Sequence, residues 1–136
     1  MKKIFGAFIF CAALCFGIFL CGAQSPSADT TVIVYYFHGS FRCPTCMHME
    51  QYSKEAVEAL GEGKPEFNAI NVEEQGATHF VNEYQLYTKA LILSCVQNGK
   101  EIKSKNLTKI WEYAHNREKF VEYVTVEIKS FLKDVQ

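Results

Sequence analysis

The stretch from Thr31 to Leu60 decides the fold, and its first half reads TVIVYYFHGSFRCPTC (31–46). The apolar run Val32–Phe37 does not alternate with polar residues, which is typical of a strand buried on both faces. A Gly-Ser pair at 39–40 ends this run, and apolar residues then recur at helical spacing as far as Leu60. The stretch therefore predicts a buried strand, a tight loop, and a helix that begins with a Cys-x-x-Cys pair.

The beginning of a helix is a chemically favourable place for two cysteines. A thiol attacks only as its thiolate, and free cysteine has a pKa of about 8.5. The unpaired N–H groups and the dipole of a helix N-terminus stabilise a negative sulfur, and Pro44 suits the first helical position. We expect Cys43 at the cap to be the exposed nucleophile. Cys46, about one turn further, is expected to be the more buried partner, close enough to form a disulfide.

Several neighbours of the pair are candidates for tuning it. Arg42 places a permanent positive charge next to Cys43 and could stabilise the thiolate or bind an oxyanion, although a solvated loop charge is the simpler alternative. His38 has a pKa in the range that permits proton relay, and the alternative is a hydrogen-bonded loop residue. Thr45 lies between the two cysteines, and Lys89 is either a site residue or a surface charge. His48 is expected either to border the site or to face water.

A static disulfide or half of a zinc site is the alternative to redox chemistry at this pair. Zinc would need a second Cys/His pair at ligand spacing, and only His48 and the distant Cys95 are available. We therefore expect no metal and no cofactor. Cys95 lies in an apolar run and is expected to be small buried packing rather than a third ligand.

The N-terminus has the composition of an export segment. Residues 1–23 combine a short basic start with a long uncharged apolar run, which predicts a signal peptide or an uncleaved membrane anchor. A lipoprotein is a further alternative, because three cysteines lie in this segment. Residues 24–30 form a polar tether and 31–136 the folded domain. We expect the protein to be exported, and to be either periplasmic or anchored to the membrane facing outward.

Cysteine count and charge exclude two classes of protein. Three of the six cysteines lie in residues 1–23, and the odd number left argues against a disulfide-stapled secreted scaffold. Without Lys2 and Lys3 the chain has 12 basic and 15 acidic residues, a net charge of −3. No basic stripe is present, so we expect no nucleic acid partner.

The rest of the chain alternates between strand and helix patterns. Asn98-Gly99 is the strongest short signal for a hairpin. We expect Tyr84, Tyr87 and Trp111 to lie mostly in the core. The expected elements, in order, are a helix that stops at 61–63, a strand at 67–72 near an edge, a short helix at 77–84, strands at 90–96 and 100–103, a helical lead-in at 107–115, and a final helix whose apolar stripe spans 120–132.

The order β-α-β-α-β-β-α, with Cys-x-x-Cys where the first helix begins, is that of a minimal thioredoxin-like fold in the α/β class. The first two strands are expected to pair in parallel across the crossover helix, and the hairpin supplies an antiparallel edge. We expect the last helix to close one face of the sheet and the Cys-x-x-Cys helix to cover the other.

Several blocks of sequence together resemble one family. They are VYYFHG and RCPTC within 34–46, NVEE at 71–74, YQLYTK at 84–89, NGKE at 98–101, and NLTKIWE at 106–112. The combination resembles the nitrophenyl compound nitroreductase subunit, or ArsF, family of small thioredoxin-like proteins from arsenic-resistance operons, over residues 31–132. The resemblance implies an exported electron-transfer subunit in the reduction of nitroaromatic arsenicals. It would form a mixed disulfide with a membrane-embedded redox or transport partner through Cys43 and Cys46.

One departure from ordinary thioredoxins bears on the mechanism. Thioredoxins carry a cis-proline just before the third strand, beside the disulfide, whereas here Thr88 or Lys89 occupies that place. Capture of a soft ion such as trivalent arsenic by the two thiolates becomes more plausible without the proline. A thiol-based binding module without turnover is therefore the alternative function. A third alternative is a structural subunit whose cysteines do little.

Overall fold

Four strands form one mixed sheet in the computed structural model of the chain, which describes residues 30–135. The strands are β1 (Thr30–His38), β2 (Glu66–Asn71), β3 (Ala90–Gln97) and β4 (Lys100–Asn106), in the spatial order β2-β1-β3-β4. β1 pairs in parallel with β2 and antiparallel with β3, and β4 completes an antiparallel hairpin. The expected export segment (1–23) and all of the tether except Thr30 lie outside the described residues.

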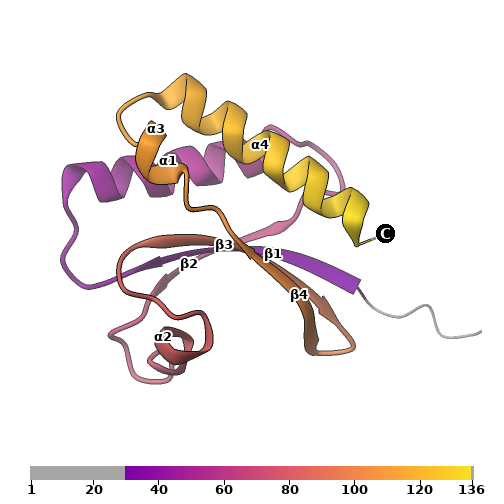
Figure 1. The fold of residues 1–136 in the computed structure, drawn as a ribbon, viewed down its shortest axis with the longest axis horizontal. Helices are drawn as coiled ribbons and strands as arrows, with labels where there is room; N and C mark the ends of the chain where they lie inside the picture. The colour runs from indigo at the N-terminus through magenta and orange to yellow at the C-terminus, as the bar shows by residue number, and fades with distance from the viewer. Residues whose placement is uncertain (1–29, 136) are drawn as a thin grey trace, which may run out of the picture.

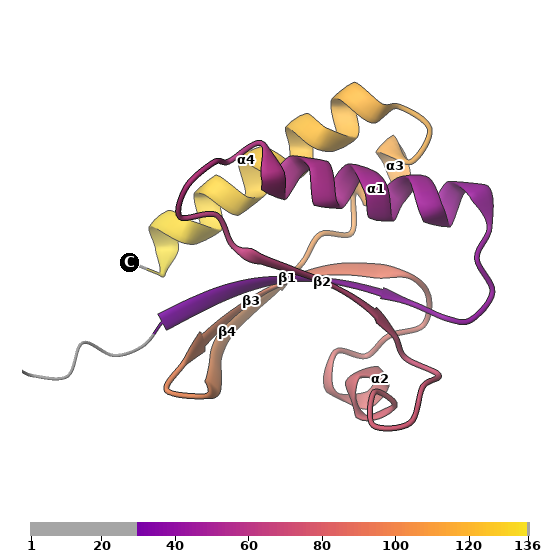
Figure 2. The same ribbon diagram turned by 180° about the vertical axis from the view of Figure 1, so that it is seen from behind.

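Two long helices cover the same face of this sheet. α1 (Pro44–Glu58) and α4 (Arg117–Asp134) pack against each other above the strands, whereas the short α2 (His79–Glu83) lies on the opposite face (Figure 1). Figure 2 shows the same layers from behind. The expectation that the last helix and the Cys-x-x-Cys helix would cover opposite faces is therefore wrong.

The return of the chain after β4 explains this arrangement. The backbone N–H of Leu107 donates to the carbonyl of Leu91, which holds the connection against β3. The short α3 (Ile110–Tyr113) then inserts Ile110 into the cluster that α1 already shares with the sheet. The apolar stripe of α4 consequently packs against both the sheet and α1, on one face of the sheet.

The two faces of β1 serve two separate apolar clusters. Val34 and Tyr36 face α1 and α4, and Phe37 faces α2, together with the partly buried Tyr35. Val34, Tyr36 and Phe37 are almost completely buried, which confirms the prediction of a strand buried on both faces. The larger cluster includes Met49 and, across the helix pair, the α4 residues Phe120, Val124, Ile128 and Phe131.

Turns and the short elements match the sequence patterns in part. Asn98 and Gly99 both have positive φ (52° and 76°), as the predicted tight hairpin requires. α2 is shorter than expected and buries none of its residues completely. Tyr87 is 92% exposed and Trp111 is 43% exposed, so the expectation that they lie in the core is wrong. In α3 the buried position is taken by Ile110, which leaves its neighbour Trp111 at the rim.

The element order and the strand order agree with the predicted minimal thioredoxin-like fold. The crossover between parallel β1 and β2 is α1, and β3 and β4 add the antiparallel side. Between residues 30 and 135, no helix is both long and apolar enough to cross a membrane.

Candidate functional site

A disulfide joins Cys43 and Cys46 at the start of α1, with 5.1 Å between their Cα atoms. Cys43 is the N-cap residue with an extended backbone, and Pro44 follows it in the first turn. The sulfur of Cys43 accepts a hydrogen bond from the backbone N–H of Cys46 at 3.2 Å. Cys43 is partly exposed and Cys46 is only 2% exposed. The geometry thus places both cysteines as the sequence predicted, and their chemical roles stay predictions.

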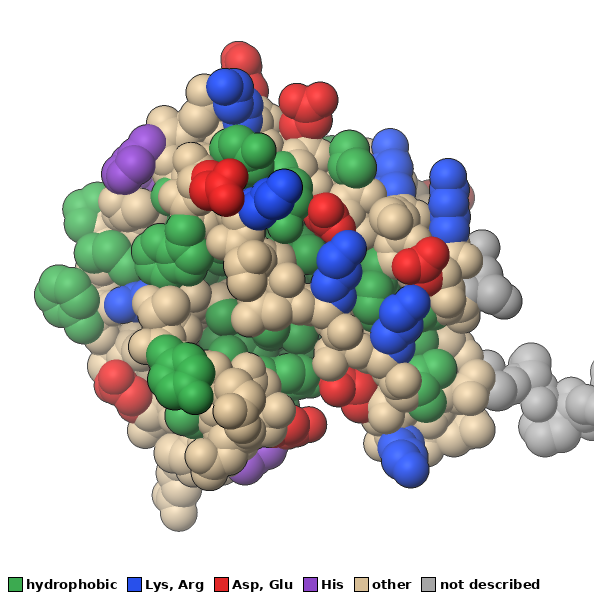
Figure 3. All heavy atoms as spheres, viewed as in Figure 1, with side chains coloured by type: hydrophobic (Ala, Val, Ile, Leu, Met, Phe, Trp, Pro, Cys, Tyr) green, Lys and Arg blue, Asp and Glu red, His purple; other side chains and the backbone are tan. Residues whose placement is uncertain are grey.

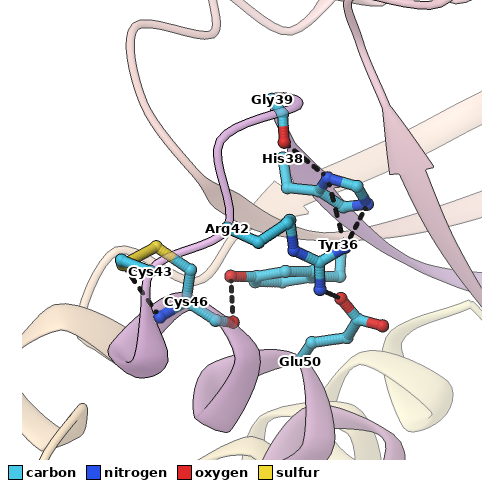
Figure 4. The surroundings of a disulfide bond; sticks show 7 residues. All are labelled: Tyr36, His38, Gly39, Arg42, Cys43, Cys46 and Glu50. Carbon is cyan, nitrogen blue, oxygen red and sulfur yellow. Dashed lines mark hydrogen bonds and ion pairs between the residues drawn. A yellow bond between two sulfur atoms is a disulfide. The ribbon is translucent and has the colours of Figure 1, made fainter.

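Arg42 turns its guanidinium away from the disulfide. One terminal nitrogen donates to the carboxylate of Glu50, and the other lies 3.1 Å from Nε2 of His38 (Figure 4). Its Nε is buried and has no hydrogen-bond partner. The positive charge that the sequence places beside Cys43 is therefore paired with a carboxylate on α1.

His38 ends β1 as a buried residue, only 9% exposed. Its Nδ1 lies 2.9 Å from the carbonyl oxygen of Gly39, an acceptor, so Nδ1 carries the proton in this arrangement. One terminal nitrogen of Arg42 lies 3.1 Å from Nε2 and 3.5 Å from Nδ1 of the same ring. These contacts favour a hydrogen-bonded histidine that links the strand end to the following loop, which was the alternative to proton relay.

Tyr36 is a site residue that the sequence did not single out. Its ring is fully buried, and its hydroxyl donates to the carbonyl oxygen of Cys46 at 2.8 Å. Burial raises the pKa of Tyr36 and the charge of Glu50 raises it further, while Arg42 opposes them. This hydrogen bond links β1 directly to the backbone of the buried cysteine. The apolar run predicts that the ring is buried but carries no signal for where the hydroxyl points.

A second set of polar contacts holds the loop that leads to Cys43. The carboxylate of Glu73 accepts from the backbone N–H of Ser40 at 3.1 Å, and Asn71 donates to the Ser40 hydroxyl. A Cβ on Gly39 would lie 2.6 Å from the Glu73 carboxylate, so glycine permits this close approach. Hydrogen bonds from Ser40 lower the pKa of the Glu73 carboxyl, and nearby Lys89 and His38 lower it further. The end of β2 thus anchors the loop.

Lys89 lies close to this loop, as its place before β3 requires. Phe37 pairs with Ala90, and Lys89 shares a groove of about 210 Å³ with His38, Gly39 and Glu73. Its neighbour Thr88 lines the same groove and is exposed.

The remaining candidates have ordinary surroundings. Thr45 is half-buried in the first turn of α1, and His48 is exposed and stacks on Tyr52 at 5.8 Å between ring centroids. Cys95 is a fully buried free thiol that pairs in register with Val32, towards the opposite end of β1 from the disulfide. The prediction that Cys95 is core packing is confirmed.

These positions predict an order of thiol reactivity. After reduction, limiting iodoacetamide near neutral pH should label Cys43 first, because it combines exposure with an N–H donor to its sulfur. Cys46 and Cys95 should react only after unfolding, because both are buried. Peptide mapping by mass spectrometry measures the order, and preferential labelling of Cys46 would reverse the assignment of the nucleophile.

No protein-family model and no curated protein matches the chain. Among solved structures, it is similar to a thioredoxin from Thermus thermophilus, with 16% identity over 69% of this chain and 71% of that one, at a TM-score of 0.46. It is also similar to Fasciola hepatica thioredoxin, with 19% identity over 64% and 81% of the two chains, at a TM-score of 0.40.

These comparisons give no support to the ArsF family in particular, which stays a prediction. The strand order and the position of the disulfide at the start of α1 characterise the chain as a thioredoxin-like α/β protein with a Cys43–Cys46 disulfide.

Proposed function

We propose that the chain is a thiol–disulfide electron carrier that works through a mixed disulfide on Cys43. The observation that carries this proposal is the asymmetry of the pair. Cys43 is partly exposed and its sulfur accepts an N–H, whereas Cys46 is buried beside it. An exposed sulfur stabilised as an anion suits attack, and a buried second sulfur suits resolution.

Exchange with a partner moves two electrons between two pairs of cysteines. The Cys43 thiolate attacks one sulfur of a partner disulfide, that S–S bond breaks, and the second partner sulfur leaves as a thiolate that takes a proton. Cys46, once deprotonated, attacks the Cys43 sulfur and releases the partner's first sulfur as a thiolate. The pair is oxidised to the disulfide and the partner is reduced by two electrons. In the reverse direction a reduced partner regenerates the dithiol.

Exposed apolar side chains near the pair support a protein partner. Phe41 precedes the cysteines and is 76% exposed, and Met47 follows them and is 47% exposed. Tyr87 and Trp111 line one groove of about 230 Å³ between the start of β3 and α3. In Figure 3, hydrophobic side chains gather on the left of the face, where Figure 1 places the start of α1 and of β3. Clustered exposed apolar groups are typical of interaction sites.

This carrier would work outside the cytoplasm, with a membrane-embedded partner, in the reduction of nitroaromatic arsenicals. The support is the apolar segment at residues 1–23 and the sequence blocks that resemble the ArsF family. Reduction of a nitro group to an amine takes several two-electron steps. A reduced membrane-embedded partner would therefore regenerate the dithiol between successive steps by the reverse exchange, and the dithiol would pass each electron pair on through the disulfide of a reductase that acts on the nitro group.

Trapping of the mixed disulfide tests the electron carrier. When the full chain is expressed in the cells to which it belongs, with their membrane proteins present, Cys46→Ser should accumulate a covalent adduct through Cys43 that dithiothreitol releases. Cys43→Ser should accumulate none. Cys95→Ser is the matched control and should behave like wild type, because that thiol is buried towards the other end of β1. Non-reducing electrophoresis and mass spectrometry identify the adduct, and its absence with Cys46→Ser would contradict the proposal.

A thiol-based binding module is the second candidate, favoured by the lack of proline before β3. The residues from 30 to 135 contain no group of three His, Cys, Asp or Glu side chains arranged to hold a metal ion. Such a module would thus bind a phenylarsine through two sulfurs only. This candidate predicts that Cys43→Ser and Cys46→Ser lose phenylarsine binding together, and that neither forms a protein adduct.

A further inference from the structure

Arg42 and Glu50 form an ion pair that brackets the cysteines along the chain. Arg42 directly precedes Cys43, and Glu50 lies one helical turn beyond Cys46 on α1. Their side chains are 32% and 27% exposed, so solvent screens the pair only in part. Figure 4 shows the guanidinium turned towards Glu50 and His38 rather than towards the disulfide.

Other titratable groups lie around this ion pair. On β1, Nε2 of His38 lies 3.1 Å from Arg42, and buried Tyr36 keeps its proton. On α1, exposed His48 stacks on Tyr52. Next to His38, Glu73 and Lys89 carry opposite charges in one groove. Along the chain, the cysteines are flanked by one cation, Arg42, and one anion, Glu50, which pair with each other.

We infer that Glu50 is a positioning residue that makes the Cys43 thiol less acidic, because it cancels the charge of Arg42. In this arrangement the N-terminus of α1, with the Cys46 N–H, stabilises the thiolate, and Arg42 contributes little net charge. The significance for electron transfer rests on the proposed function. The acidity itself is measurable on the reduced protein, whether or not a partner is found.

If the charges of Arg42 and Glu50 cancel at Cys43, the direction of the pKa shift depends on which of the two is removed. A purely structural role of the pair would not give this difference. Removing Glu50 leaves an unpaired cation, which favours the thiolate, whereas removing Arg42 leaves an unpaired anion, which opposes it. An opposite charge nearby favours the ionised form of a titratable group, and a like charge disfavours it. The two single variants should therefore shift the pKa of Cys43 in opposite directions. General loosening of the helix N-terminus would shift both in the same direction.

The test is the pH dependence of iodoacetamide alkylation at Cys43 in the reduced full chain. Glu50→Gln keeps an oxygen acceptor for Arg42 and should lower the pKa of the Cys43 thiol. Below the pKa, alkylation should then be about threefold faster for each unit by which the pKa falls, because the gain in thiolate is partly offset by lower nucleophilicity. Arg42→Gln should raise the pKa, and the double variant should return close to wild type.

Another ion pair on the same helix provides the control. Glu55→Gln breaks the contact of Glu55 with Arg117 on α4 and should leave the pKa of Cys43 unchanged. Arg42→Lys, which keeps the charge, should stay near wild type. An unchanged pKa in Glu50→Gln, or equal shifts in both single variants, would overturn the inference. If Glu50→Gln does not fold, a fall in the pKa with Arg42→Gln would overturn it equally.

A glutathione titration separates this inference from the proposed function. If the pair exchanges, Glu50→Gln should move the equilibrium towards the reduced form, because a stabilised thiolate favours the dithiol. If opposite shifts in pKa occur but the disulfide does not exchange with glutathione, the charge balance stands and the electron carrier fails.

Discussion

Phe120→Ala is expected to remove a large part of the stability of the folded domain. Phe120 is completely buried in α4, within the cluster between the sheet and α1, and its ring meets Tyr52 edge-on at 5.6 Å. Truncating a buried phenylalanine costs about 3–5 kcal/mol, against a total free energy of unfolding of about 5–15 kcal/mol in typical domains. Urea unfolding of the oxidised protein should show a much lower midpoint with an unchanged slope.

Val126→Ala on the same helix is the matched control. Val126 is 58% exposed, so its truncation should change the free energy of unfolding by about 0.5 kcal/mol or less. Equal losses in the two variants would mean that the stripe beginning at Phe120 does not form the interface with α1 and the sheet.

Much of the fold was predictable from local sequence patterns, because a strand, a tight turn and a helix start are each determined by residues that are neighbours in the chain. The apolar run at 32–37 requires burial on both faces, and Asn98-Gly99 permits the positive φ values that a tight hairpin needs. Pro44 and the helical spacing after it fixed the start of α1 at the cysteines. Strand, loop and Cys-x-x-Cys helix were therefore predictable together.

The face that α4 covers was not predictable in this way. Periodicity shows that a helix has an apolar stripe, but it does not specify which surface the stripe meets. That choice depends on the return of the chain through Leu107 and Ile110. The same limit explains Trp111, since a four-residue helix has only one buried position and Ile110 occupies it.

The polar contacts of the site were the least predictable part. Adjacency in sequence suggested that Arg42 acts on Cys43, but a long side chain can turn, and here it reaches Glu50 and His38. The anchoring of Ser40 by Glu73 links positions that lie far apart in the chain. Such contacts follow only from the packed arrangement of β1, β2 and α1.

Alkaline pH is expected to destabilise the folded domain, with Tyr36 as a principal cause. Burial, followed by the charge of Glu50, raises the pKa of Tyr36 above its ordinary value. Tyr84, whose hydroxyl donates to Glu101, also has a pKa raised by burial. An unfolded tyrosine loses its proton near pH 10, whereas the buried phenol keeps it. The stabilising contribution is complete below about pH 10 and is lost as the pH rises further.

Tyr36→Phe isolates the contribution of this one phenol. Near neutral pH the variant should be less stable by about 1 kcal/mol, because the hydrogen bond to the Cys46 carbonyl is lost. Above about pH 10 the wild type should lose up to about 1.4 kcal/mol per pH unit through Tyr36, and the variant should lack this contribution. Tyr87→Phe, at a side chain that is 92% exposed, is the control and should follow the wild type throughout. Urea midpoints from about pH 8 to pH 11 give both curves. Curves that stay parallel for Tyr36→Phe and wild type would show that this phenol is not held protonated by the fold.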